Sequence, residues 1–231
     1  MRTALLFVLA LLVTVDSSAQ SSPEALQLIR SVNARFAKVK DYTADAKIET
    51  RISFLNILPQ KAAVFYKRPD KFRFKAKGIA VLPKQDFGAL FRLTANESDF
   101  MAYVTGQDTV TRRKVQVINI IPVADTGDLV LAKIWIDPSR SLILRSQLTT
   151  RSNGTIVIDY EFGDMADFAL PDRMVFTIEV KKFKIPRAVS ADINSSSSKY
   201  PAGKEPKTGQ IEILFSNYLL NKGLQDSVFR D

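Results

Sequence analysis

The side chains that most often perform catalysis are either missing from this chain or stand alone. The sequence contains no histidine and no cysteine, which excludes serine triads, cysteine–histidine dyads and metal sites built on imidazole. Asp125-Thr126-Gly127 carries the aspartic-protease signature, but that chemistry needs two aspartates that share one proton, and the triplet occurs once. Only a dimer could supply the second copy, so we interpret the triplet as a turn between strands.

A group of carboxylates offers a second possible chemistry. Asp159, Glu161, Asp164 and Asp167 could pair for glycoside hydrolysis or bind calcium. The first two alternate outward on a predicted strand and the others lie in a turn, which favours solvated carboxylates. The Ser195 to Ser198 run has no evident general base nearby. We therefore expect no enzyme, no catalytic residue, no metal site and no cofactor, and a hydrolase is the weakest functional alternative.

The beginning of the chain has the layout of a secretory signal. Arg2 precedes an apolar run from Ala4 to Val13, and Ser17-Ser18-Ala19 supplies small residues. The run has about ten residues, roughly half of a membrane span, so we predict cleavage after residue 19 rather than an anchor. With no cysteine to carry lipid, we expect a soluble periplasmic protein without disulfides or lipidation, whose residues 20–231 form a single domain.

Charge and hydropathy are those of a basic globular protein. The formal net charge is +9, with clusters at Lys67 to Lys77, Arg112 to Lys114 and Lys181 to Lys184. Such cations can simply solvate the outer faces of strands, or they can make transient contact with an anionic membrane surface or an acidic partner. An exported chain without a recognition motif predicts no nucleic-acid binding.

One amphipathic helix and many strands are predicted. Ser22 as N-cap and Pro23 start a helix whose apolar face repeats to Val39 and which should end near Asp41. Alternation of apolar and polar residues, bounded by turn residues, predicts strands. These are Tyr42–Phe54, Phe65–Lys67, Lys71–Lys77, Leu90–Thr94, Phe100–Thr105, Lys114–Ile121, Leu129–Ile136, a hairpin from Leu142 to Phe162 around Asn153-Gly154, Arg173–Val180 and Gln210–Tyr218.

These elements predict a mainly β (α+β) protein. A large antiparallel sheet of roughly ten strands must curl, and it has only the N-terminal helix and a short helical lid near Pro83 to Leu90 to cover it. We therefore expect an incomplete, half-open β-barrel with a hydrophobic hollow; a fully packed sandwich is the alternative. The Ser-, Lys- and Pro-rich stretch 188–209 is predicted to be a flexible loop.

The order of these parts resembles the LolA family of periplasmic outer-membrane lipoprotein carriers, whose fold is shared with LolB and RseB-like proteins. Lys67-Arg68-Pro69-Asp70-Lys71-Phe72 is the most specific match. Weaker matches are Ile120-Ile121-Pro122, the Ile-Trp-Ile-Asp of 134–137, the Asn153-Gly154 hairpin and the ending at 221–229. Ile79 to Phe91 and the Ser-rich loop depart from the simplest carriers. The missing lipid-attachment cysteine separates the chain from LolB.

The resemblance implies a concave face that holds acyl chains. Candidates for the cavity wall are the apolar residues of the predicted inner face: Tyr42, Ile48, Ile52, Phe54, Phe65, Phe72, Phe74, Ile156, Ile158 and Phe176. Ordinary core packing is the competing interpretation for each of them. The family's functional arginine falls on Arg68, which could hold the helical lid or meet a polar group of the cargo, or could simply be a solvated turn residue. Trp135 shares parity with Lys133 and is predicted to face outward.

Three functions follow from this reading. The first is a carrier, most simply a monomer, that takes acyl chains of lipoproteins or lipids from an inner-membrane donor complex to an outer-membrane acceptor. The second is a lipid- or lipoprotein-sensing regulator on the same fold, as in the RseB-like relatives, although those have a second domain for which this chain is short. The third is the hydrolase.

Overall fold

Ten antiparallel strands form one open sheet. The computed structural model describes residues 21–52, 57–76, 90, 93–124, 127–152, 154–179 and 208–230. The sheet order is β3-β2-β1-β10-β9-β8-β7-β6-β5-β4. The strands are β1 Asp41–Arg51, β2 Gln60–Lys67, β3 Lys71–Ala76, β4 Phe100–Val110, β5 Arg113–Pro122, β6 Leu129–Asp137, β7 Leu142–Thr150, β8 Gly154–Glu161, β9 Arg173–Glu179 and β10 Thr208–Leu220.

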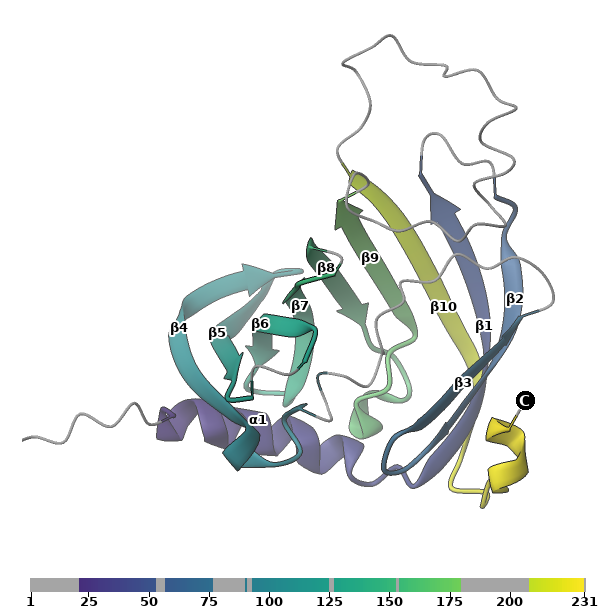
Figure 1. Cartoon of the computed structure of the whole chain (residues 1–231), viewed down its shortest axis with the longest axis horizontal. Coiled ribbons are helices and arrows are strands. Elements are labelled where there is room, and N and C mark those ends of the chain that lie inside the picture. Colours follow the sequence, from purple (N-terminus) through teal and green to yellow (C-terminus); the bar gives the residue numbers. More distant parts are fainter. Residues whose placement is uncertain are drawn as a thin grey trace, which may run out of the picture.

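The sheet curls without closing, so the predicted half-open barrel is confirmed. Figure 1 shows the strands bending round one interior, with β3 and β4 at the two ends of the curve. Each neighbouring pair is antiparallel, and β10 inserts between β1 and β9, which joins the first strands of the chain to the last. A sheet of this size reduces its twist strain by curling, and the curl creates a concave and a convex face.

The helix α1 (Pro23–Phe36) runs across one end of the curled sheet (Figure 1). As predicted, Ser22 is its N-cap, and the Ser22 side chain accepts a hydrogen bond from the Ala25 N–H at 3.3 Å. The predicted end near Asp41 is wrong. The helix stops at Phe36 because the carbonyls of Asn33 and Arg35 are already capped by turn N–H groups, and Asp41 begins β1.

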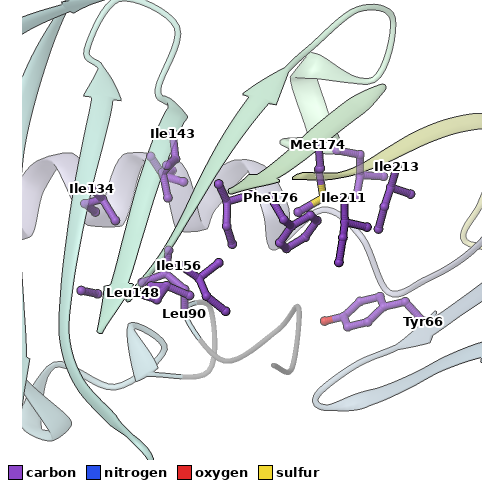
Figure 2. Packing of buried hydrophobic residues seen from close by; sticks show 14 of the residues in the cluster. Tyr66, Leu90, Ile134, Ile143, Leu148, Ile156, Met174, Phe176, Ile211 and Ile213 are labelled. Carbon is purple, nitrogen blue, oxygen red and sulfur yellow. The ribbon is translucent and has the colours of Figure 1, made fainter. Parts of the chain in front are cut away.

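Apolar side chains of the concave face form the main core. Period-two alternation places paired residues such as Ile48 and Ile213 on the same face of β1 and β10. Isoleucines dominate this core, and Figure 2 shows them gathered with Phe176 and Met174 from β9. The fully buried isoleucines are Ile48, Ile118, Ile120, Ile134, Ile136, Ile156, Ile178, Ile211 and Ile213.

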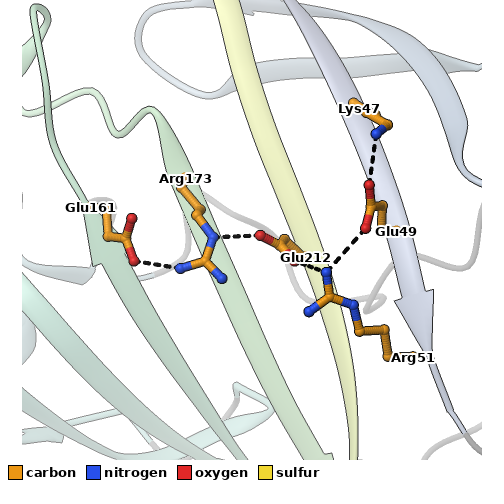
Figure 3. Close-up of polar contacts among 6 residues, drawn as sticks. All are labelled: Lys47, Glu49, Arg51, Glu161, Arg173 and Glu212. Atoms are coloured by element: carbon orange, nitrogen blue, oxygen red, sulfur yellow. Dashed lines mark hydrogen bonds and ion pairs between the residues drawn. The ribbon is translucent and has the colours of Figure 1, made fainter.

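The convex face carries a row of alternating charges. Glu212, on β10, is 6% exposed and lies between Arg51 and Arg173, which neutralise its carboxylate from both sides. The row extends outward through ion pairs to further partners on β1 and β8 (Figure 3), which are Glu49, Lys47 and Glu161. Cross-strand pairs of opposite charge stabilise adjacent strands and keep this face polar.

A second, smaller cluster surrounds Trp135 on the same outer face of β5 and β6. The predicted outward direction of Trp135 is right, but the ring is only 6% exposed. Its Nε1–H donates to Asp108 Oδ2 at 2.9 Å, and Lys133 Nζ lies 5.0 Å from the ring centroid. The indole therefore satisfies its single donor and packs as a core residue, with Val115, Val117 and Leu144 in the same cluster.

Two further predictions need correction, and several others lie outside the described residues. Leu90 and Leu93 are helical rather than part of a strand, and the Thr94 N–H donates to the Leu90 carbonyl at 3.0 Å. β4 consequently pairs with β5 instead. Residues 208–209 begin β10, so they are not part of the predicted loop. Outside the described residues lie the signal 1–19, Phe54, Asp125-Thr126, the rest of the 188–209 loop with Ser195–Ser198, and 83–89 of the predicted lid.

Candidate functional site

Two adjoining pockets lie where α1 crosses the concave face. The outer pocket has a volume of about 580 Å³ and lies between the second half of α1, the β2–β3 turn and residues 94–97. The inner pocket has a volume of about 90 Å³ and is lined by α1, β1, β2, β3, β7, β8, β9, Leu90 and the 162–171 segment. Phe36, Tyr66 and Phe72 line both pockets, so these three rings form the wall that divides them.

Aromatic rings form most of this dividing region. The Phe36 and Tyr66 ring centroids are 5.2 Å apart, and those of Tyr66 and Tyr42 are 5.4 Å apart. Tyr42 in turn meets Tyr218 at 5.6 Å. Figure 2 shows Tyr66 pointing into the interior from β2, while Met174 and Phe176 enter it from β9. The rings come from the helix and three strands, so any shift of α1 changes how they pack.

Tyrosine hydroxyl groups are the polar atoms of the inner pocket. Burial raises the pKa of the Tyr160 phenol to about 12, even though Ser146 Oγ lies 2.9 Å from its oxygen. Burial also raises the pKa of the Tyr42 phenol well above its usual value. Both groups are therefore neutral at physiological pH, and the inner pocket presents apolar carbon with uncharged hydroxyls.

Ion pairs and amide contacts hold the rim of the outer pocket. Arg30 on α1 makes two hydrogen bonds to Glu97, Nε to Oε1 at 2.5 Å and Nη2 to Oε2 at 2.6 Å. One turn later, Asn33 Nδ2 donates to the Thr94 carbonyl at 2.8 Å. These contacts join α1 to residues 94–97. The Arg30–Glu97 pair is largely solvent-exposed, so water and salt screen it and it contributes little to stability.

Arg68 closes the other side of the rim. Its Nη1 donates to the carbonyl of Ala37, the C-cap of α1, at 2.7 Å. Its backbone N–H donates to the Lys40 carbonyl at 2.9 Å. A cation at a helix C-terminus interacts favourably with the helix dipole and with the free carbonyls. The side chain thus contacts the end of α1; the predicted contact with the lid near residues 83–90 or with a polar group of the cargo stays a prediction.

The structure distributes the predicted wall residues over several environments. Tyr42 lines the inner pocket and Phe72 lines both pockets. Phe74 is half-buried, and its ring centroid lies 5.3 Å from that of Phe72. The remaining concave-face candidates are packed inside the main core, between 1% and 5% exposed: Ile48, Ile52, Ile156, Ile158 and Phe176.

Phe65 was assigned to the wrong face. It pairs with Thr43 on β1 and Arg73 on β3, whereas its neighbours Val64 and Tyr66 are the buried residues of β2. Paired residues of antiparallel strands share a face, so Phe65 lies on the convex side. Val64, Phe65 and Tyr66 are consecutive apolar residues, and such a run does not reveal which parity points inward.

Several lining residues were missed from the sequence. Asn33 and Phe36 reach the pockets from α1, and Leu170 and Met174 reach the inner pocket from the segment before β9 and from β9 itself. The helical apolar period identified the face that includes Phe36, but nothing local shows which strands that face meets. The alternation of Tyr66 with Val64 was the sequence signal that could have placed Tyr66 on the inner face.

Most of the carboxylates considered for hydrolysis or calcium binding, and interpreted as solvated, are paired with arginines. Arg145 Nε donates to Asp159 at 2.6 Å, Arg35 Nη1 donates to Asp167 at 2.8 Å, and Arg173 binds Glu161. Within the part of the chain that the structure describes, no group of three or more acidic residues is arranged to hold a metal ion. None of the helices described is long and apolar enough to cross a membrane.

Solved structures share this fold. A domain from Vibrio parahaemolyticus named for outer membrane lipoprotein sorting matches with a TM-score of 0.60 at 10% identity, covering 89% of this chain and 96% of that one. A DUF1329 family protein from Desulfovibrio piger matches with a TM-score of 0.57 at 10% identity, covering 91% and 98%. A LolA superfamily protein from Nitrosomonas europaea matches with a TM-score of 0.51 at 10% identity, covering 90% and 97%.

The comparisons confirm the predicted resemblance at the level of the fold. No protein-family model and no curated protein matches the sequence. At 10% identity over nearly the whole of both chains, the half-open sheet with its helix shares the fold of these three structures, one of which is a LolA superfamily protein.

Proposed function

We propose that the protein is a soluble periplasmic carrier that binds the acyl chains of lipoproteins or lipids on its concave face and carries them toward the outer membrane. The single observation that carries the proposal is the pair of adjoining pockets between α1 and the concave face. The lipoprotein-sorting name of a structure with the same fold supports the same cargo class.

Burial of hydrocarbon supplies the binding energy in this proposal. Each methylene that leaves water contributes about 0.8 kcal/mol, so a chain needs contact with carbon and no reactive group. The outer pocket admits the chain, and the rings of Phe36, Tyr66 and Phe72 then separate so that its end enters the inner pocket. Uncharged tyrosine hydroxyls offer no competing charge inside.

Movement of the second half of α1 makes room for longer chains. Its contacts at the rim are the exposed ones made by Arg30, Arg35 and Arg68 and the half-buried hydrogen bond from Asn33 to the Thr94 carbonyl. Exposed ion pairs and hydrogen bonds are weak, so burial of a few methylenes offsets the loss of these contacts. The first half of the helix stays anchored by Ala25 and Ile29, which are at most 3% exposed.

The test is a binding assay with a blocked inner pocket. Purified protein is titrated with a fluorescent fatty acid, which saturated fatty acids of increasing length then displace. Met174→Trp fills the inner pocket, and we expect affinity to fall at least about tenfold, which corresponds to about 1.4 kcal/mol. Val130→Trp, at an exposed position of β6, is the matched control and should bind as the wild type does. Equal affinity in both variants would exclude the inner pocket.

Recovery of the protein from its own cell envelope tests the remaining parts of the proposal. Native mass spectrometry of the periplasmic protein should show a chain that begins at Gln20 and carries acyl species. A stable complex with a membrane signalling protein and no bound acyl chain would instead support the regulatory alternative, and turnover of a substrate would support the hydrolase.

A further inference from the structure

Three chain segments bring basic residues together beside the outer pocket. They are the α1–β1 connection with Lys38 and Lys40, the β2–β3 turn with Arg68, and the residues after β10 with Lys222. Asn221 joins two of these segments, because its side chain accepts from the Lys40 N–H at 2.7 Å and donates to the Lys38 carbonyl at 3.1 Å. Figure 1 shows the three segments meeting at the end of the molecule where α1 ends.

The carboxylates in this region do not neutralise these cations. Asp41 is 5% exposed and accepts the backbone N–H groups of Lys222, at 2.9 Å, and Gly223, at 3.0 Å. Asp226 lies between Lys67 Nζ, at 2.7 Å, and Lys71 Nζ, at 2.6 Å, and these two ammonium groups lower its pKa to about 2. Asp70 is the remaining carboxylate, and it is exposed in the turn itself.

Four exposed cations are left, which we call the basic rim: Lys38, Lys40, Arg68 and Lys222. None of them pairs with a carboxylate of the described residues, and the Arg68 guanidinium donates only to the uncharged Ala37 carbonyl. Arg68 also lines the outer pocket. Asp70 lines the same pocket and offsets one of the four charges, so the basic rim keeps a positive excess that includes Arg68 in the pocket lining.

We propose that the basic rim docks the protein on an anionic lipid bilayer, with the outer pocket facing the lipid. The inference rests on the proposed function, because a bilayer is where acyl chains are found. Three of the four cations are lysines, whose flexible point charges suit a diffuse layer of phosphate headgroups better than one geometrically defined partner. Docking in this orientation lets a chain pass between bilayer and pocket without crossing water.

Vesicle flotation tests the docking surface. Wild-type protein is mixed with phosphatidylcholine vesicles that contain about one third phosphatidylglycerol, and with vesicles of phosphatidylcholine alone. A lysine near an anionic surface contributes about fivefold in partitioning. The triple variant Lys38→Gln, Lys40→Gln, Lys222→Gln should thus bind the anionic vesicles about 100-fold more weakly. Added salt should weaken the wild type toward the variant, since screening shortens the range of the attraction.

A second triple variant with the same loss of charge is the control. Lys61→Gln, Arg112→Gln and Lys114→Gln remove exposed cations from the start of β2 and from the β4–β5 turn, far along their strands from α1. This control should retain most of the vesicle binding. Equal losses of vesicle binding in the two variants would mean that net charge alone attracts the protein to the bilayer. If the wild type binds vesicles equally well with and without phosphatidylglycerol, the proposal is wrong.

Fluorescent fatty-acid binding without vesicles separates this inference from the proposed function. The rim variant should bind the fatty acid in solution with wild-type affinity, because Lys38, Lys40 and Lys222 do not line either pocket. If the rim variant binds both the fatty acid and the anionic vesicles as the wild type does, the basic rim is not the docking surface, and the carrier proposal is unaffected. If the wild-type protein does not bind the fatty acid, the carrier proposal itself is rejected.

Discussion

Two parts of the same concave face pack differently. Across β5, β6, β8, β9 and β10 the inward residues are mainly isoleucines, and Ile118, Ile134, Ile156 and Ile178 are at most 1% exposed. Where the end of α1 meets β1, β2 and β3, the aromatic rings of Phe36, Tyr42, Tyr66 and Phe72 gather, and they line the inner and outer pockets. One sheet face therefore provides both the stability core and the candidate binding site.

The shape of the side chains explains the contrast. Branched aliphatic side chains have few rotamers and interdigitate on a pleated surface. Aromatic rings are flat and rigid, and the ring planes in this region meet at 46° for Phe36 and Tyr66 and at 64° for Tyr42 and Tyr218. Phe36, Tyr66 and Phe72 border the space of both pockets. Because these rings come from separate elements, a modest shift of α1 can change that space.

A charge in the aliphatic part should have the largest effect. Ile48→Asp places an unpaired carboxylate at a position that is 2% exposed and opposite Ile213. Burying an unpaired charge costs several kcal/mol or more, which is comparable to the whole stability of a domain. We expect no cooperative thermal unfolding transition by circular dichroism. A stably folded variant that still binds fatty acid would show that the faces are reversed.

Truncation in each part should separate stability from binding. Ile156→Ala removes a side chain that is 1% exposed and should lower the free energy of unfolding by about 2–5 kcal/mol. Phe72→Ala removes a half-buried ring shared by both pockets, so it should cost less stability and shift the preferred fatty acid to a longer chain. Urea unfolding and displacement assays measure the two effects. If both variants show the same changes in unfolding free energy and in fatty-acid preference, the two parts of the concave face do not differ in role.

Loss of the contact at the end of α1 should have a smaller effect. Arg68→Ala removes the exposed hydrogen bond to the Ala37 carbonyl and should lower stability by no more than about 1 kcal/mol. We expect faster hydrogen exchange of the last turn of α1 and faster release of bound fatty acid in stopped-flow experiments. Arg68→Lys keeps the charge and should be intermediate. If the alanine variant releases fatty acid at the wild-type rate, Arg68 has no role in release.

The smallest effect at neutral pH concerns the tyrosines of the aromatic part. The pKa of Tyr160 is raised from 10.0 to about 12 in the folded protein, so the unfolded chain loses this proton first. The stability that the neutral phenol contributes is fully present below pH 10 and is lost as the pH rises to about 12. Ultraviolet titration of tyrosinate should show delayed ionisation, which urea abolishes. Ordinary titration of every tyrosine would show that the inner pocket is wet.

Much of the strand layout was predictable because period-two alternation is a local property. The face of Ile48 follows directly from its polar neighbours Lys47 and Glu49, and the faces of Ile156, Phe176 and Ile213 follow from one polar neighbour each and the alternation of their strands. The alternation is uninformative where apolar residues are consecutive, as at Phe65, and a short apolar stretch such as 90–94 suits a helix turn as well as a strand. The sequence also did not show that Glu212 is buried, because its two arginine partners lie on other strands.

By itself, the sequence determined a large antiparallel sheet with one apolar face, a capped amphipathic helix, and no histidine or cysteine for catalysis. Only the tertiary structure decided which part of that face is filled and which part is hollow. The physical reason is that alternation specifies the direction of each side chain, whereas a pocket depends on how rings from α1, β1, β2 and β3 meet after the sheet has curled.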